Sequence, residues 1–213
     1  MLNNPGHPLP MNGGFELGAH QTKTFTVPDH WAGRFWGRTG CDASGHCQTG
    51  DCGNKIACNG AGGVPPVSLA EITFDGDGGQ DFYDVSLVDG YNLPMKMLPI
   101  AGTFRRVTNS HYDCNEAGCH SDLNAHCPNE LAIRSGNKVI ACKSACLAFN
   151  TDEYCCRGAH NRPETCKSSQ WKVNYPAMFK KSCPEAYSYA YDDHSSTFTC
   201  HGNPSTGYVV QFC

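Results

Sequence analysis

Cysteine is the residue type whose chemistry stands out in this sequence. The chain has 15 cysteines among 213 residues, and the last of them, Cys213, is also the final residue. Cytosolic thiols stay reduced and rarely form structural bridges, so this density indicates a disulfide framework made in an oxidising compartment. Because the number is odd, one sulfur has no partner within the chain. We expect either a free thiol or a partner cysteine that this sequence lacks.

Acidic and histidine residues elsewhere suit metal binding, but each group has a simpler interpretation. Residues 75–81 (DGDGGQD) resemble the start of a calcium-binding loop. An EF-hand needs a bidentate Glu at the twelfth position, where this chain has Ser86, so a hairpin turn is favoured. His111, His120 and His126 lie near cysteines, as zinc ligands would, but those cysteines are expected to form bridges. We therefore expect no metal and no cofactor.

The overall composition excludes several classes of partner. The formal net charge is −4, so the chain lacks the basic surface that nucleic acid or an anionic membrane would need. No apolar run approaches the roughly 18 residues of a membrane span. The 23 Gly and 13 Pro favour turns and short strands over long helices. The first residues carry no signal-peptide pattern although the cysteines indicate secretion, so we expect the chain to begin inside a longer precursor.

The elements that would position reactive groups are short. Alternating, β-branched or aromatic segments predict six strands: Thr22–Val27, Arg34–Gly37, Leu69–Phe74, Phe82–Val88, Ser196–Thr199 and Tyr208–Phe212. Helical patterns are fewer: Lys143–Phe149, a new start at Asn150 supported by Glu153, and residues 176–183. The sequence thus predicts a mainly β fold with an inserted cysteine-rich lobe.

Several motifs together resemble one known family. The stretch Cys47–Gly53 (CQTGDCG), followed by Cys58, is similar to the signature of thaumatin-like proteins, the pathogenesis-related group five family. Ala43 departs from the pattern, because the family usually has Gly there. Further segments agree in order and spacing: FWGRT from Phe35, PP from Pro65, LAE from Leu69, DVSLVDG from Asp84, YNLPM from Tyr91, EYCC from Glu153 and CPEAYSY from Cys183. The resemblance covers nearly the whole chain.

The resemblance implies a fold and a division of the chain. The fold would be a thaumatin-like β-sandwich or flattened barrel, whose core comprises residues 1–40, 66–113 and 177–213. Residues 41–65 would form a small disulfide loop domain. Residues 114–176 would form a disulfide-rich lobe of helices and loops.

The resemblance also implies a disulfide pairing, which cysteine spacing alone leaves open. Members of the family pair all of their cysteines, which number one more than in this chain. Carried over in order, the expected bridges are Cys41–Cys47, Cys52–Cys58, Cys114–Cys200, Cys119–Cys183, Cys127–Cys142, Cys146–Cys155 and Cys156–Cys166. The family's first strand and first cysteine have no counterpart here, so we expect Cys213 to be unpaired. The chain would then lack the roughly 4–5 kcal/mol that a bridge closing nearly the whole chain contributes.

The family has an acidic cleft beside its β core, and this chain matches its charged residues at Arg34, Glu71, Asp84, Asp89 and Asp193. A carboxylate cluster suits glycoside hydrolysis, which needs a protonated acid and a second carboxylate, and crowded acids raise one another's proton affinity. If the chain hydrolyses glucan, we expect Glu71 to be the acid and Asp89 the second carboxylate. Asp84 and Asp89 are an odd number of residues apart, so they share one cleft only if the chain bends near Val88–Gly90.

The resemblance further implies a secreted, extracellular and monomeric defence protein, for which three functions remain open. The first is antifungal binding of β-1,3-glucan or fungal cell-wall polysaccharide through the cleft. Sugar rings would then stack on aromatic side chains, with candidates Phe82, Tyr83, Tyr91 and Phe104. The second is hydrolysis, as an endo-β-1,3-glucanase. The third is a role as an inhibitor or receptor ligand that binds no glycan.

Overall fold

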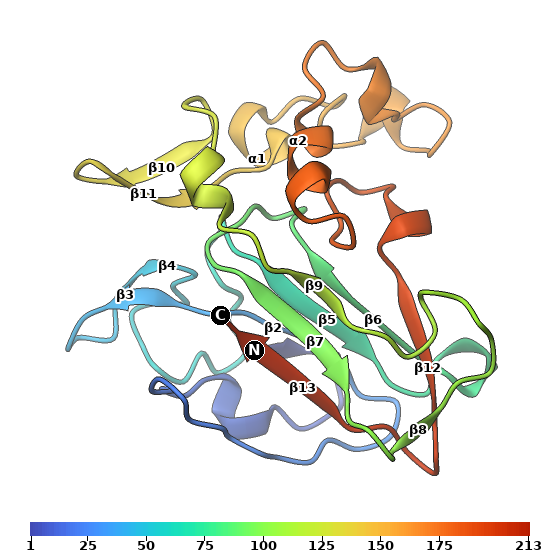
Figure 1. Ribbon diagram of the computed structural model, residues 1–213. Coiled ribbons are helices and arrows are strands. Elements are labelled where there is room, and N and C mark those ends of the chain that lie inside the picture. Colours follow the sequence, from blue (N-terminus) through green and yellow to red (C-terminus); the bar gives the residue numbers. More distant parts are fainter.

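Two antiparallel sheets pack face to face in the computed structural model, which describes every residue from Met1 to Cys213 (Figure 1). The larger sheet has the strand order β1 (Leu2–Asn3), β2 (Ala32–Phe35), β5 (Leu69–Thr73), β6 (Asp81–Ser86), β12 (Phe198–Gly202) and β8 (Phe104–Arg105). The smaller sheet has the order β13 (Tyr208–Phe212), β7 (Met95–Pro99) and β9 (Ala117–Cys119). The mainly β class predicted from the sequence is confirmed.

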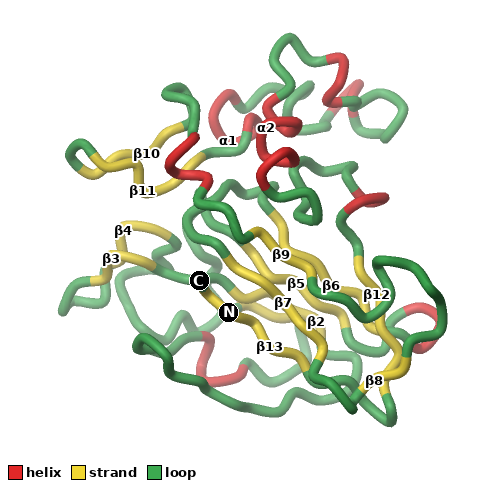
Figure 2. Tube along the Cα trace, in the orientation of Figure 1, coloured by secondary structure: helices red, strands yellow, loops and turns green.

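The remaining elements are small. Two hairpins pair β3 (Thr39–Cys41) with β4 (Cys47–Thr49) and β10 (Ala132–Ser135) with β11 (Lys138–Cys142). The α-helices are α1 (Ala145–Phe149) and α2 (Tyr175–Ser182), and single 3₁₀ turns lie at Pro10–Gly13, Asp77–Gly79, Leu123–His126, Gly158–His160, Ser168–Gln170 and Asp193–Ser195. Figure 2 shows that loops join most of these elements, especially around α1 and α2. None of the helices has the length and apolar character of a membrane span.

Side-chain alternation divides the six-stranded sheet into two faces. The inner face packs into the core between the sheets and carries Ala70, Ile72, Tyr83 and Val85, all of which are buried. Cross-strand partners share a face, and β5 and β6 pair Ala70 with Val85 and Ile72 with Tyr83. The intervening residues therefore point to the outer face, away from the three-stranded sheet.

Seven disulfides fasten the chain, and they join the same cysteines as the pairing implied by the resemblance: Cys41–Cys47, Cys52–Cys58, Cys114–Cys200, Cys119–Cys183, Cys127–Cys142, Cys146–Cys155 and Cys156–Cys166. Two of them close long loops, with sequence separations of 86 and 64 residues. The other five are local, with sequence separations of 6 to 15 residues. Cys213 is unpaired and exposed. The division into a core, a loop domain and a lobe stays a prediction.

The strand expected at Thr22–Val27 is wrong. These residues form neither helix nor strand, and most of their side chains are exposed. Phe25 and Val27 are partly buried, so the alternation does reflect which side chains turn inward. No neighbouring strand offers its backbone groups to this segment, however, and β-propensity without a partner does not form a strand. The nearby strand is β2, which begins only at Ala32.

The helical start expected at Asn150 is also wrong, because this residue ends a helix. Asn150 is left-handed, with φ of 50°, and its N–H donates to the carbonyl of Cys146, which closes α1. Asn tolerates this conformation well and often occupies it at helix ends. The chain then turns back, so that the Cys146–Cys155 bridge can form. The predicted helix at Lys143–Phe149 is confirmed with a later start, since Ser144 caps it by accepting from the N–H of Leu147 at 3.2 Å.

Candidate functional site

Three charged residues form a row across the outer face of the six-stranded sheet. Arg34 on β2 lies directly opposite Glu71 on β5, and Glu71 lies opposite Asp84 on β6. Directly opposed residues in an antiparallel sheet have Cβ atoms about 4.5–5.5 Å apart. We call Arg34, Glu71 and Asp84 the acidic row. Strand register alone thus brings together three of the five residues that the resemblance singled out.

Asp193 lies at the Asp84 end of the row and is held by a tyrosine. The hydroxyl of Tyr187 donates to Oδ1 of Asp193 at 2.7 Å and lies 2.5 Å from Oγ1 of Thr197. Tyr187 runs alongside β6 in a parallel bridge with Ser86, so its position relative to the sheet is fixed by the backbone. Thr197 directly precedes β12, the strand next to β6. Sequence reasoning did not single out Tyr187 or Thr197, because nothing in their spacing signals a site.

An ion pair holds the loop that carries Tyr187 and Asp193. Nζ of Lys180 on α2 lies 2.9 Å from Oδ2 of Asp192 and donates to the carbonyl of Ala186 at 2.9 Å and to Oγ of Ser196 at 2.8 Å. The same Asp192 oxygen accepts from the N–H and the hydroxyl of Ser188, at 3.0 and 2.7 Å. Asp192 therefore holds the loop in place from within, while its neighbour Asp193 lies beside the acidic row.

Asp89 lies in a tight turn that follows β6. Strand β6 ends at Ser86, and Gly90 has φ of +88°, a conformation that favours glycine. A Cβ at this glycine would lie 2.7 Å from the carbonyl oxygen of Cys142 and from Cβ of Pro66, so close packing also requires a glycine. The N–H of Gly90 donates to the carbonyl of Leu87 at 2.9 Å, so Val88 and Asp89 lie in a turn and strand parity does not apply between Asp84 and Asp89. Asp89 is near enough to Glu71 to help raise the pKa of that carboxyl.

The pKa values of both central carboxyl groups are raised. Burial raises the pKa of Asp84 well above its ordinary value, and the charges of Glu71 and Asp193 raise it further. Although the residue keeps some exposure, its Oδ1 atom is buried and has no hydrogen-bond partner. Burial also raises the pKa of Glu71, which Arg34 opposes and Asp89 reinforces. A carboxyl group without a partner for its oxygen is least costly when it is neutral.

Two of the four aromatic residues expected to stack on sugars are buried. Tyr83 and Tyr91 are both 0 % exposed and lie in the core, where their hydroxyls donate to the carbonyls of Asn115 and Ser121. Their proposed stacking role is therefore wrong, because no ligand can reach their rings. Phe82 is different, since it shares the outer face of β6 with Asp84 and is partly exposed.

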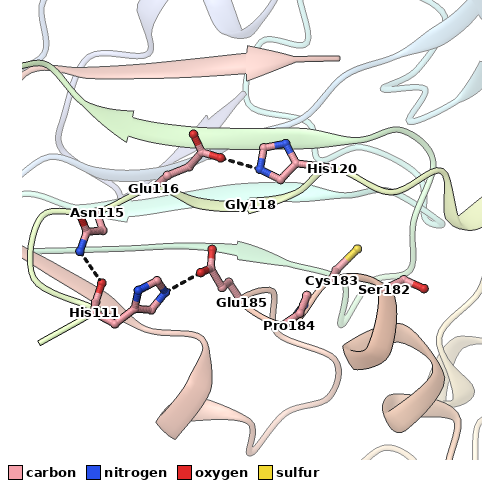
Figure 3. Close-up of a pocket in the computed structure, with 9 residues that line it drawn as sticks. All are labelled: His111, Asn115, Glu116, Gly118, His120, Ser182, Cys183, Pro184 and Glu185. Carbon is pink, nitrogen blue, oxygen red and sulfur yellow. Dashed lines mark hydrogen bonds and ion pairs between the residues drawn. The ribbon is translucent and has the colours of Figure 1, made fainter.

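A separate cavity of about 510 Å³ lies between β9 and the turn that follows α2 (Figure 3). His111 pairs with Glu185 and His120 with Glu116, each at 2.5 Å, and Nζ of Lys96 lies 3.3 Å from Glu116. None of the five residues singled out by the resemblance lines this cavity. No three His, Cys, Asp or Glu side chains in the chain are grouped closely enough to hold a metal ion. His111 and His120 thus contact carboxylates in this structure, whereas His126 forms no ion pair.

Comparisons with known proteins agree with this architecture. A model of the Thaumatin family matches residues 1–213. Pathogenesis-related protein 5 of Arabidopsis thaliana is 55% identical over 206 residues, which cover 95% of this chain and 79% of the relative. Thaumatin-like protein 1 of Pyrus pyrifolia is 50% identical, covering 100% of this chain and 84% of the relative. A protein of Prunus avium named glucan endo-1,3-beta-glucosidase is 48% identical, covering 94% of this chain and 78% of the relative. On this evidence the chain belongs to the thaumatin family.

Proposed function

We propose that this chain is a secreted defence protein that binds β-1,3-glucan, or a related fungal cell-wall polysaccharide, through the acidic row together with Asp89 and Asp193. The observation that carries the proposal is the row itself, in which Arg34, Glu71 and Asp84 face outward from adjacent strands. Disulfides of this number support secretion, because they persist only in oxidising compartments.

The chemistry of the row suits a neutral ligand that carries many hydroxyl groups. An ionised carboxylate only accepts hydrogen bonds, a protonated one can donate, and a guanidinium only donates. The row offers all three: Arg34 donates, Glu71 can accept, and a neutral Asp84 can donate. A sugar hydroxyl both donates and accepts, so it can satisfy neighbouring members of the row at once. A polyanionic ligand would instead meet repulsion from those acidic groups of the site that are ionised.

Hydrolysis is the second candidate function, and one finding favours it specifically. A relative that is 48% identical over most of the chain is named a glucan endo-1,3-beta-glucosidase. Glu71 would then protonate the leaving oxygen, which its raised pKa supports, and Asp89 would act as the second carboxylate. The third possibility is an inhibitor or receptor ligand that binds no glycan, and this role would require neither Glu71 nor Asp89.

One experiment separates these functions. The protein is incubated with an insoluble linear β-1,3-glucan, and both the bound fraction and newly formed reducing ends are measured. Glu71→Gln is compared with wild type and with Glu164→Gln, a matched change at an exposed acid in the lobe. We expect wild type and the Glu164 variant to bind equally, and the Glu71 variant to bind at least several-fold less.

The outcomes are distinct. Binding without new reducing ends supports a glucan-binding protein. Turnover that disappears only in the Glu71 variant supports the glucanase. If wild type neither binds nor cleaves the glucan, or if the Glu71 and Glu164 variants behave alike, the proposal is wrong.

A further inference from the structure

The cavity of Figure 3 lies along the free edge of a strand, and we call it the β9 cavity. Strand β9 is the last strand of the three-stranded sheet, with β7 on one side and no strand on the other. Glu116, Gly118 and His120 form one wall of the cavity, and His111 and residues 182–185 at the end of α2 form the opposite wall (Figure 3). A free strand edge offers backbone N–H and C=O groups to a further strand.

The register of the sheet shows which backbone groups of β9 face the cavity. On the other side of β7, the N–H of Cys213 donates to the carbonyl of Pro94 at 3.1 Å, and the N–H of Ile100 donates to the carbonyl of Gly207 at 2.8 Å. Hydrogen-bonded pairs alternate along an antiparallel ladder, so Lys96, two residues from Pro94, also bonds to β13. Lys96 therefore directs its N–H and C=O away from β9.

Gly118 carries the free backbone groups of β9. It lies directly opposite Lys96, so the two residues form a non-hydrogen-bonded pair. Such pairs are closely spaced, and a Cβ at Gly118 would lie only 2.9 Å from Cβ of Lys96. The N–H and C=O of Gly118 therefore point away from β7, to the edge that borders the cavity, where no hydrogen bond within the chain reaches them. A buried backbone group without a partner costs free energy, which a bound strand would recover.

The free edge is recessed, which limits what can pair with it. Gly118 is buried although it lines the cavity, and the partly exposed side chains of Glu116 and His120 flank it. A folded sheet would bring its neighbouring strands against the cavity walls, whereas a single extended chain can enter a cavity of about 510 Å³. The geometry thus suits one extended peptide, in the recognition mode known as β-strand addition.

The charges of the walls favour a peptide with a basic side chain. Glu116 has two partners, Nζ of Lys96 at 3.3 Å and Nε2 of His120 at 2.5 Å. Glu185 on the opposite wall contacts only Nε2 of His111, through Oε1, so its Oε2 is free to accept a hydrogen bond. The chain as a whole has a formal net charge of −4. A lysine or arginine in a bound peptide would complement both the local carboxylate and the overall charge.

We propose that the β9 cavity docks an extended peptide segment of a partner protein. The peptide pairs with the free edge of β9 at Gly118, to which it both donates and accepts a backbone hydrogen bond, and it places a lysine or arginine beside Glu185. The cavity shares no lining residue with the acidic row, so this interaction goes beyond the proposed binding of glucan.

The test uses a set of pentapeptides that are blocked at both ends and have a central lysine. The other positions carry valine, threonine or tyrosine, which favour an extended chain. Binding is measured by isothermal titration calorimetry and by hydrogen exchange of the protein's backbone amides with and without peptide. The amides of Ala117 and Cys119 point to β7 and are the internal controls for exchange. A fully N-methylated peptide with the same side chains has no backbone donors and is the matched control ligand.

We expect at least one peptide of the set to bind saturably and to slow exchange at Gly118, while exchange at Ala117 and Cys119 stays unchanged. The N-methylated peptide should bind about tenfold more weakly, because backbone bonds to Gly118 are lost. Glu185→Gln should weaken binding of the lysine peptide about twofold to fivefold, the effect of a partly exposed ion pair, and should not change binding of a peptide with a central glutamine. Glu164→Gln, at an exposed acid in the lobe, should match wild type.

Several results would overturn the proposal. If no peptide of the set binds saturably, the cavity is not a peptide site. If the N-methylated peptide binds as tightly as its parent, or if exchange at Gly118 does not change on binding, the peptide does not pair with β9. If Gly118 becomes protected as the protein concentration rises without peptide, the occupant is a second copy of this chain. Equal affinities of the Glu185 and Glu164 variants for the lysine peptide would refute the role of Glu185.

Discussion

Replacing Asp84 with Asn tests the electrostatics of the acidic row. Asn has nearly the shape of the protonated Asp side chain but cannot ionise. In the wild-type protein, burial together with Glu71 and Asp193 raises the pKa of Asp84 well above 3.8. The folded protein therefore keeps a proton on Asp84 at pH values where the unfolded chain has already released it. We expect this difference to make the stability of the wild type depend on pH.

The sign and size of the effect follow from proton linkage. Below pH 3.8 the carboxyl is protonated in both states and contributes no pH dependence. Above this pH the folded state holds more protons, so the free energy of unfolding falls by up to about 1.4 kcal/mol per pH unit until the folded-state carboxyl ionises. Asp84→Asn lacks this contribution. Its stability relative to wild type should therefore rise by up to the same amount per pH unit through that window.

The measurement is urea unfolding of both proteins, with disulfides intact, at a series of pH values from about 4 to 8. Asp77→Asn is the control, because Asp77 is an exposed acid in the turn before β6. We expect the control to follow the wild-type curve. The reasoning would be refuted if the free energy of unfolding depended on pH in the same way for Asp84→Asn and wild type. It would also be refuted if the variant lost stability relative to wild type as the pH rises.

Three further predictions concern what holds the site in place. Lys180→Met should lower the free energy of unfolding, measured in urea, by about 2 kcal/mol, because it leaves Asp192 unpaired in a half-buried position. It should also weaken glucan binding; unchanged binding would show that the ion pair does not position the loop. Tyr187→Phe should lower the free energy of unfolding by about 1 kcal/mol and weaken glucan binding, because Asp193 loses its donor. Replacing both cysteines of the Cys114–Cys200 bridge by Ser should cost roughly 4–5 kcal/mol, against about 2 for the Cys41–Cys47 bridge, since the loops they close span 86 and 6 residues. Equal losses for the two bridges would contradict the loop-entropy argument.

The strands were predictable where alternation coincides with a partner strand. Leu69–Phe74 and Phe82–Val88 alternate because one face is buried, and the structure pairs them as β5 and β6. Thr22–Val27 has a similar local pattern, but its failure to find a partner depends on the whole fold. Asn150 shows a related limit, since Asn suits both the start and the end of a helix. In that case the decisive feature is tertiary, namely the bridge from Cys146 to Cys155.

The candidate site was predictable from the resemblance but not from periodicity. The row of Arg34, Glu71 and Asp84 depends on the register of three strands, which the sequence does not specify. The bend at Gly90 could be suspected but not established. Burial of Oδ1 of Asp84 and the bond between Tyr187 and Asp193 depend on how a distant loop packs against β6. Such contacts have no local sequence signal.

Chemical-shift mapping by NMR with a linear β-1,3-gluco-oligosaccharide tests the central claim most directly, because it locates the ligand without a substitution. If the acidic row binds the glucan, the largest saturable shifts should fall on Arg34, Glu71 and Asp84, with smaller ones at Asp193. Shifts confined to the separate cavity at His111 and Glu185, or no saturable shifts at all, would contradict it.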